Sequence, residues 1–178
     1  MNIFFVNSDP IVAAQSLVDR HCVKMILESA QLLSTAHRYL DGFEILGKSK
    51  TGRNAKRWIL DDSRENVLYQ ATHINHPSAI WSRNSIENYN WLVEHFFALG
   101  DEYTYRYGKT HKCFGELSSI LKSTPNKLTK NGVTTMPCAM PSEYIISEDP
   151  IVNYRNYYMN GKKNLHKWTK RFPPIWLS

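Results

Sequence analysis

The sequence predicts a mostly α-helical fold, organised as a single compact domain over residues 1–178 with a short extended N-terminal segment and a candidate small hairpin. Apolar residues recur at helical spacing over two long stretches, and residues that favour helix starts precede both of them. A chain of 178 residues with 42% hydrophobic side chains is long enough to bury one core and rather short for two.

The first elements lie within the opening 42 residues. Residues 2–6 form a short extended run, after which Asp9 supplies an N-cap and Pro10 the first position of a helix. The helical pattern continues for about 30 residues to Leu40, and Gly42 ends it. We therefore expect one uninterrupted long helix here.

The next segment, residues 43–60, has apolar ends around a polar middle that contains glycine, which predicts a hairpin or a basic loop. The cations of this middle are Lys48, Lys50, Arg53, Lys56 and Arg57. Such a segment can contact phosphates, and it can equally serve only to keep the surface soluble.

The remaining elements follow from caps and helix breakers, with Ser85 and Asp149 as N-caps and Gly108 as a helix end. In chain order we expect a short helix over 78–83, a long helix over 85–107, a short helix over 110–124, a loop over 125–141 that wraps the domain, a last helix after Asp149 and an apolar, packed tail over 171–178.

Charge and cysteine content limit the classes of partner and compartment. Lys and Arg outnumber Asp and Glu by 22 to 16, and the net charge of +6 makes an anionic partner plausible. Three cysteines without paired spacing argue against a disulfide framework and a cysteine-based zinc site, so a reducing cytoplasm is expected. No apolar run is long enough to predict a membrane span.

A narrow polar line runs along the first long helix. At 100° per residue, its members fall within an arc of about 80°. They are His21, Lys24, Glu28, Gln31 and Thr35. Lys24 and Glu28 can simply satisfy each other as an i,i+4 pair. If the line is partly buried, desolvation instead shifts both groups towards neutrality, as an amine nucleophile or a general acid requires.

The second long helix carries a comparable line, whose members are Asn84, Asn88, Trp91, His95, Glu102 and Arg106. Two such helices can pack around a shared polar site, or each can present a solvated face. His73 and His76 form only a weak metal pattern, so we predict neither a metal nor a cofactor. The glycine-rich signatures of P-loop and dinucleotide enzymes are absent, as is the nucleophile elbow.

Three stretches resemble a family of small proteins encoded by tailed bacteriophages, including cyanophages: residues 9–38, 76–112 and 139–158. The order of parts is also remotely similar to that of pyrimidine-dimer DNA glycosylases. This resemblance implies a compact helical enzyme that cuts the glycosidic bond of a damaged base and nicks the strand. It also implies the cytoplasm of a host cell as the location.

In the glycosylases, an amine attacks the sugar C1′ to form a Schiff base, a glutamate on the first helix guides the chemistry, and arginines hold phosphates. Here Glu28 is the only glutamate of that helix, and Lys24 is the nearest cation. The usual amine is an N-terminal one that follows removal of methionine, but Asn2 is too large for routine removal. The amine is therefore that of Met1, that of Lys24, or absent, and the adjacent Arg-Glu pair of the glycosylases is missing.

The leading hypothesis is thus a DNA base-excision enzyme that uses Glu28, Lys24 and His21, with Trp81 or Trp91 stacking on an extruded base. The expected nucleic-acid contacts are Arg53, Lys56, Arg57, Arg83, Asn88, His95, Arg106, Lys109, Lys162 and Lys163. One alternative is a non-catalytic phage factor that binds nucleic acid or protein. Another is an enzyme acting on a nucleotide or modified base, with a polar pocket made of His21, Glu28, His95 and Glu102.

Overall fold

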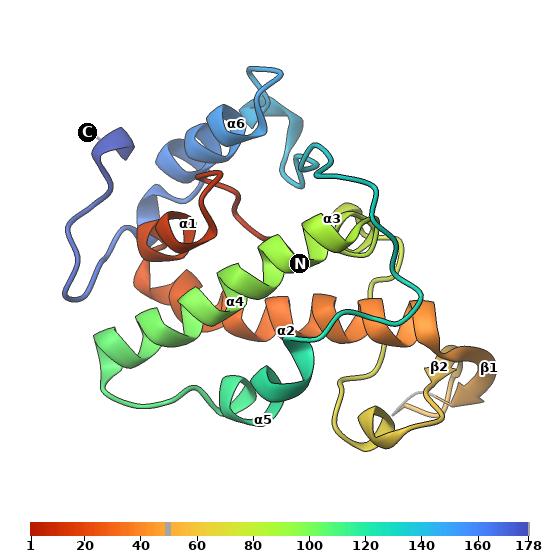
Figure 1. Ribbon diagram of the computed structural model, residues 1–178. Coiled ribbons are helices and arrows are strands. Elements are labelled where there is room, and N and C mark those ends of the chain that lie inside the picture. Colours follow the sequence, from red (N-terminus) through yellow and green to blue (C-terminus); the bar gives the residue numbers. More distant parts are fainter. Residues whose placement is uncertain (49–50, 178) are drawn as a thin grey trace.

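Two long helices, α2 and α4, pack against each other at the centre of the computed structural model, which describes residues 1–48 and 51–177 (Figure 1). The helices are α1 (Pro10–Ser16), α2 (Asp19–Asp41), α3 (Pro77–Ser82), α4 (Ile86–Tyr107), α5 (Lys112–Leu121) and α6 (Pro150–Asn156). The only sheet among the described residues is a hairpin of β1 (Phe43–Lys48) and β2 (Asn54–Ile59). The helix-dominated fold class is thereby confirmed.

Single turns complete the architecture. The 3-10 turns are Ser63–Asn66, Ser142–Tyr144, Lys163–Leu165 and Ile175–Leu177, and a π-helical turn, Tyr157–Gly161, continues α6. The core lies where α1 and α5 meet the two long helices, and it includes Ile26, Leu33, Leu92, Phe96 and Leu117. Burying each of these side chains contributes about 1.5–3 kcal/mol.

The prediction of one helix from residue 9 to residue 40 is wrong, because the chain breaks between α1 and α2. Leu17 and Val18 are extended, with ψ of 142° and 156°. Their backbone groups bond to distant side chains: Arg106 donates to the Leu17 carbonyl (2.9 Å), and the Val18 N–H donates to the Tyr158 hydroxyl (3.2 Å). These tertiary hydrogen bonds replace the helical ones, so the break costs no unsatisfied group.

The predicted caps are confirmed. The Asp9 carboxylate accepts from the Ile11 and Val12 amides, the Ser85 hydroxyl accepts from the Asn88 amide, and the Asp149 carboxylate accepts from the Ile151 amide. Gly108 ends α4 in the left-handed region with φ of 70°. Each cap satisfies backbone groups that the helix end leaves unbonded.

The hairpin is also confirmed. Its strands are antiparallel, with Ile45 opposite Arg57 and Leu46 opposite Lys56. Figure 1 places it beyond the C-terminal end of α2, away from the helical body. Lys50, one of the expected cations, lies outside the described residues.

The N-terminal segment is extended only in part, and it forms no strand. Phe4 adopts a positive φ of 56°, and its carbonyl accepts from the Val6 amide at 2.8 Å. The segment therefore turns sharply and passes beneath the helices instead of pairing with a strand. A non-glycine residue in this region costs of the order of 1 kcal/mol, which the burial of Ile3 and Phe4 offsets.

The chain after α5 wraps the helices as expected. In the loop over 125–141, Leu128 and Met136 are buried in the core. The expectation of a packed tail is only half correct. Trp176 packs edge-on against Tyr158, whereas Phe172 is almost fully exposed.

Candidate functional site

The carboxylate of Glu28 lies where the start of the chain meets α2. Its Oε2 accepts a hydrogen bond from the backbone N–H of Asn2 (2.9 Å), and its Oε1 is 3.1 Å from the Nζ of Lys24. The Glu28 side chain is only 11% exposed, whereas that of Lys24 is 60% exposed. A nearly buried carboxylate is thus held between a backbone donor and an accessible ammonium.

Asn2 holds the chain start in this position. Its side-chain oxygen accepts from the amides of Ile3 (2.7 Å) and Phe4 (3.0 Å), and its side-chain nitrogen donates to the Ala139 carbonyl (2.8 Å). These three bonds fix the backbone that donates to Glu28. The amine-bearing residue, Met1, is half-buried and packs against the core immediately before Asn2. The N-terminal amine is therefore a covalent neighbour of the group that bonds Glu28.

His21 lies beneath this arrangement and supports it. Its ring stacks on Phe4, with centroids 4.2 Å apart and planes within 17°, and its Nδ1 is 2.7 Å from the Tyr158 hydroxyl. Burial, together with the positive charges of Lys162, Lys24 and Arg20, lowers the pKa of His21 to about 3. The ring is neutral near pH 7 and supports Phe4, and its expected part in catalysis stays a prediction.

His76 belongs to the same region, although the sequence pointed only to a weak metal pattern there. Its Nδ1 accepts from the Ser78 amide (3.2 Å) and so caps α3. Burial lowers the pKa of His76, the charge of the N-terminal amine lowers it further, and the Glu28 carboxylate opposes them. His76 is therefore within electrostatic range of both. A histidine before a proline at a helix start was the signal that could have found it.

The expected polar line of α4 faces the interior. Asn88, His95 and Arg106 are buried, so the expectation that they contact phosphates is wrong. Asn88 donates to the Trp81 carbonyl (2.9 Å) and to Thr134 Oγ1 (2.7 Å), and it accepts from the Thr134 amide (3.0 Å). The Nδ1 of His95 is 3.0 Å from the Pro10 carbonyl. These groups join α4 to the segments packed on it.

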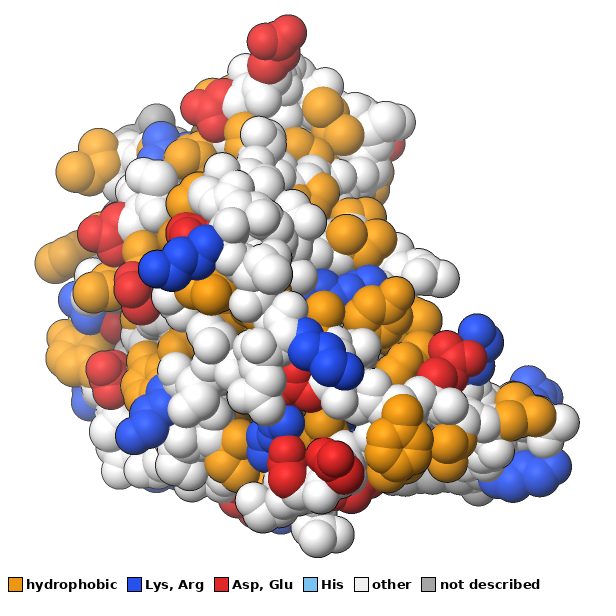
Figure 2. Space-filling view, turned by 45° about the vertical axis from the view of Figure 1, so that its right-hand side comes forward, with side chains coloured by type: hydrophobic (Ala, Val, Ile, Leu, Met, Phe, Trp, Pro, Cys, Tyr) orange, Lys and Arg blue, Asp and Glu red, His pale blue; other side chains and the backbone are white. Residues whose placement is uncertain are grey.

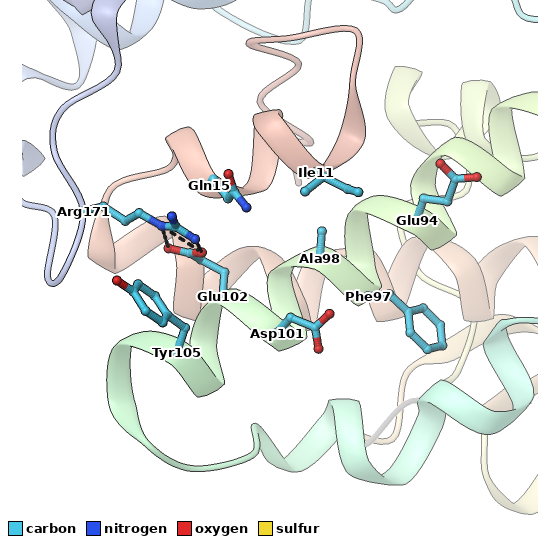
Figure 3. Close-up of a pocket in the computed structure, with 9 residues that line it drawn as sticks. All are labelled: Ile11, Gln15, Glu94, Phe97, Ala98, Asp101, Glu102, Tyr105 and Arg171. Atoms are coloured by element: carbon cyan, nitrogen blue, oxygen red, sulfur yellow. Dashed lines mark hydrogen bonds and ion pairs between the residues drawn. The ribbon is translucent and has the colours of Figure 1, made fainter.

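Glu102 lines a hollow to which Glu28 does not contribute. This hollow, of about 450 Å³, runs between α1 and α4 (Figure 3). Glu102 pairs there with Arg171 (2.7 Å) and with the buried Arg106 (2.6 Å). The polar pocket proposed from His21, Glu28, His95 and Glu102 therefore does not form.

The two tryptophans offer no free stacking platform. Trp81 is 4% exposed, and its indole N–H donates to the Thr134 carbonyl (3.0 Å). Trp91 donates to the Ser8 carbonyl (2.6 Å) and stacks on His95. The expectation of base stacking is thus corrected for Trp81, which belongs to the core, while Trp91 is held in place by its neighbours.

Arg83 is likewise engaged within the protein. Its guanidinium donates to the Ala79 (2.8 Å) and Ile74 (2.6 Å) carbonyls and lies over the ring of Tyr39, 4.2 Å from the centroid. These two bonds engage two of its five N–H donors. Its main role is to join α3 to α2, in place of the expected phosphate contact.

The other expected cations occupy three separate surfaces. Arg53, Lys56 and Arg57 lie on the hairpin. Lys162 lies over the Tyr157 ring, 4.7 Å from the centroid, and acts on His21, while its neighbour Lys163 is exposed. Lys109 follows Gly108 at the end of α4 that lies furthest from the hairpin (Figure 1). The first two surfaces flank α2, and the third follows the end of α4 that contacts the start of α2, where Arg106 and Tyr107 bond to Asp19.

Comparisons with protein-family models, curated proteins and solved structures found no match to this chain. Over residues 1–48 and 51–177, no three His, Cys, Asp or Glu side chains gather closely enough to hold a metal ion. Within the same residues, none of the helices combines the length and the apolar character that a membrane crossing requires.

Proposed function

We propose that the protein is a DNA glycosylase with abasic-site lyase activity, which works through an amine beside Glu28. One observation carries the proposal: the chain start and the Lys24 ammonium meet on the two oxygens of the same nearly buried carboxylate. An amine nucleophile and an adjacent carboxylate are the two groups that Schiff-base cleavage of a glycosidic bond requires.

The chemistry follows from these two groups. The neutral amine attacks C1′ of the deoxyribose, so that an N–C1′ bond forms while the glycosidic bond breaks and its electron pair leaves with the base. The base takes up a proton. Glu28 then accepts the proton of the attached amine and passes it to the ring oxygen as the ring opens to the iminium ion. Removal of a C2′ proton finally expels the 3′ phosphate and cuts the strand.

Two amines compete for the role of nucleophile, that of Met1 and that of Lys24. In peptides an α-amine titrates about 2–3 pH units below a lysine, so a larger fraction of it is neutral near pH 7. The Nζ of Lys24 is engaged in an ion pair with Oε1 of Glu28, at 3.1 Å. We therefore assign the nucleophile to the Met1 amine and a phosphate-holding role to Lys24.

The surroundings of Glu28 suit a polyanion. The cations at the start of α2 are Arg20 and Lys24, and the charges of both lower the pKa of the nearby His21. Lys162 lies close enough to lower the pKa of His21 as well. All three side chains reach the surface. They form a positive rim beside the carboxylate, where the phosphates that flank a target nucleotide can bind.

The test is trapping of the Schiff base. The purified protein is incubated with duplex DNA containing an abasic site, with ultraviolet-irradiated duplex and with undamaged duplex, in borohydride and EDTA. We expect a covalent adduct with the abasic duplex, and with irradiated DNA if its pyrimidine lesions are the target. Removing one catalytic acid or base typically costs about 10²–10⁴-fold in rate. Glu28→Gln should therefore lose the adduct while it retains DNA binding.

The chain supplies a matched control. Lys112 and Glu116 form the same i,i+4 pair on α5, at 3.8 Å and in an exposed position. Glu116→Gln and Lys112→Met should leave trapping unchanged. Lys24→Met should retain the adduct, whereas acetylation of the N-terminal amine should abolish it. The proposal is wrong if Glu28→Gln traps DNA like the wild type, or if the wild type binds DNA without any adduct or nick.

A further inference from the structure

The hairpin exposes a group of apolar side chains. Leu46 is 74% exposed, Phe43 is 55% exposed and Ile45 is 41% exposed. Only Trp58 is buried within the two strands, where its ring lies 5.7 Å from that of Tyr39. The hairpin projects from the body, and Figures 1 and 2 show it at the lower right. Apolar groups grouped on a projecting ribbon favour a surface that binds a partner.

Cations accompany these apolar groups on both faces of the ribbon. Because opposite residues of an antiparallel pair share a face, Leu46 lies beside Lys56, and Ile45 lies beside Arg57. The described residues between 43 and 59 include four cations and one carboxylate, that of Glu44. This carboxylate pairs with Lys56 at 2.8 Å. Positive charge interleaved with apolar side chains complements the phosphates and base edges of a nucleic acid.

The hairpin is joined to the same face of α2 as the candidate site. At 100° per residue, Lys24, Glu28 and Tyr39 lie within about 60° of one another around the helix. Tyr39 is the residue on which Trp58 packs, so the ribbon is anchored to this face. A ligand lying along α2 from Glu28 towards the C-terminal end of the helix would therefore meet the hairpin next.

The length of α2 sets the spacing between the two. Glu28 and Gly42 are separated by 14 residues, which corresponds to about 21 Å along the helix. Base pairs of B-DNA rise by about 3.4 Å each, so this distance equals about six base pairs. A two-stranded ribbon fits the major groove, which is about 12 Å wide.

We propose that the hairpin enters the major groove of duplex DNA about six base pairs from the nucleotide held at Glu28. Lys56 and Arg57 bind the phosphates that border the groove, and Leu46 lies against the base edges. The placement of the nucleotide rests on the proposed function. The consequence concerns substrate class: the hairpin makes the protein prefer double-stranded over single-stranded DNA.

The test compares the wild type with the hairpin variant Leu46→Ser/Lys56→Gln/Arg57→Gln, in which all substituted side chains reach the surface. Abasic sites are presented in duplex and in single-stranded DNA, and borohydride adducts are counted at low protein concentration. We expect trapping on duplex to fall about tenfold or more, because two phosphate contacts and one apolar contact are lost. Trapping on single strands should change less than about twofold, because a single strand has no groove.

Hydroxyl-radical footprinting measures where the hairpin lies on the duplex. The wild type should protect the duplex at the abasic site and again about six base pairs away, and the hairpin variant should lose only the second protection. The matched control is Ile146→Ser/Lys112→Gln/Lys122→Gln, which removes an exposed apolar residue and two exposed lysines elsewhere. It should leave trapping and both protections unchanged.

Three results would overturn the inference: equal loss of trapping on duplex and single strands, a footprint that the hairpin variant does not alter, or no second protection in the wild type. Failure of the proposed function is recognised separately, because the wild type then forms no adduct with any DNA. Even then, equilibrium binding to undamaged duplex tests the hairpin, whose variant should bind about tenfold more weakly than wild type and control. Unchanged binding would instead assign the apolar ribbon to a protein partner.

Discussion

The nearly buried carboxylate of Glu28 is bonded by two donors that differ in mobility, and this difference allows one of its oxygens to be freed. The backbone N–H of Asn2 is fixed by three other hydrogen bonds of Asn2, whereas the Lys24 ammonium is carried on a long, exposed side chain. On the proposed function, DNA phosphates draw Lys24 away and leave the carboxylate bound on one oxygen only. The freed oxygen is then available to accept a proton.

Three buried histidines give the protein a specific dependence on pH. Burial lowers the pKa of His21 to about 3, and those of His37 and His95 to about 4. Below about pH 6.5 the unfolded chain binds protons on these rings and the folded protein does not. The free energy of unfolding should therefore decrease as pH falls from about 6.5 to about 4, by up to ~1.4 kcal/mol per pH unit and ring.

Urea unfolding at pH 7.5, 6 and 5 measures this dependence. His95→Gln should reduce the decrease by less than about one third, whatever its effect on stability at pH 7.5, because the pKa values of His76 and His111 are also lowered. His73→Gln is the matched control, since His73 is exposed, and it should keep the full decrease. A stability that stays constant between pH 7.5 and pH 5 would contradict the assignment of neutral, buried rings.

Single residues also mark the limit of what the sequence predicts. The pairing of Lys24 with Glu28 follows from their spacing and was expected as one of two alternatives. The arrival of Asn2 at Glu28 could not be predicted, because it depends on a turn at Phe4 that no glycine or proline signals. His76 joins the site only through the path of the chain between β2 and α3.

Among the elements, local signals were reliable wherever a cap decides the boundary. Asp9, Ser85, Gly108 and Asp149 all occupy the cap positions that the sequence predicts. The break between α1 and α2 has no such signal, because residues 16–19 contain neither glycine nor proline. Arg106 stabilises it from α4, and a contact across 89 residues leaves no trace in local periodicity.

The helix lines illustrate the same limit. A polar line on an otherwise apolar helix predicts that this side of the helix is exposed to solvent. Most of the polar line of α4 is instead buried, because its members bond to the segments that cover the helix. Arg106 pairs with Glu102 and with Asp19, and Arg171 brings a second positive charge to Glu102, so these charges are compensated within the protein. Periodicity reports which residues share a face, and it does not report whether that face is covered by protein or by water.

The packing of α5 on α4 depends on a glycine. A Cβ at Gly100 would lie 2.6 Å from the ring of Phe114, whereas the nearest atom to a Cβ at Gly115 is 3.7 Å away. Gly100→Ala should lower the free energy of unfolding by about 1–3 kcal/mol, because the overpacked ring must shift. Gly115→Ala, also within a helix, should raise it by up to about 1 kcal/mol through helix propensity. Urea unfolding of both variants compares them, and equal effects would contradict the close approach.

On the scale of the whole molecule, the net charge of +6 is distributed so that cations flank Glu28 along α2. Arg20, Lys24 and Lys162 lie near the start of the helix, and Lys56 and Arg57 lie on the hairpin beyond its end. The acidic hollow that contains Glu102 lies instead between α1 and α4. This separation of charge gives the protein one preferred direction along which a polyanion can bind.

The salt dependence of DNA binding tests this distribution quantitatively. On the proposed function, five cations, Arg20, Lys24, Lys162, Lys56 and Arg57, contact phosphates and release counterions. The logarithm of the association constant for undamaged duplex should therefore fall with the logarithm of salt concentration at a slope of about −4.5. Lys56→Gln/Arg57→Gln should reduce the slope to about −2.7, because two contacts are lost. Lys112→Gln/Lys122→Gln removes the same charge from the two ends of α5 and should keep the original slope. Fluorescence anisotropy at four salt concentrations measures all three proteins. Equal slopes for the two variants would mean that net charge, and not the arrangement along α2, governs binding.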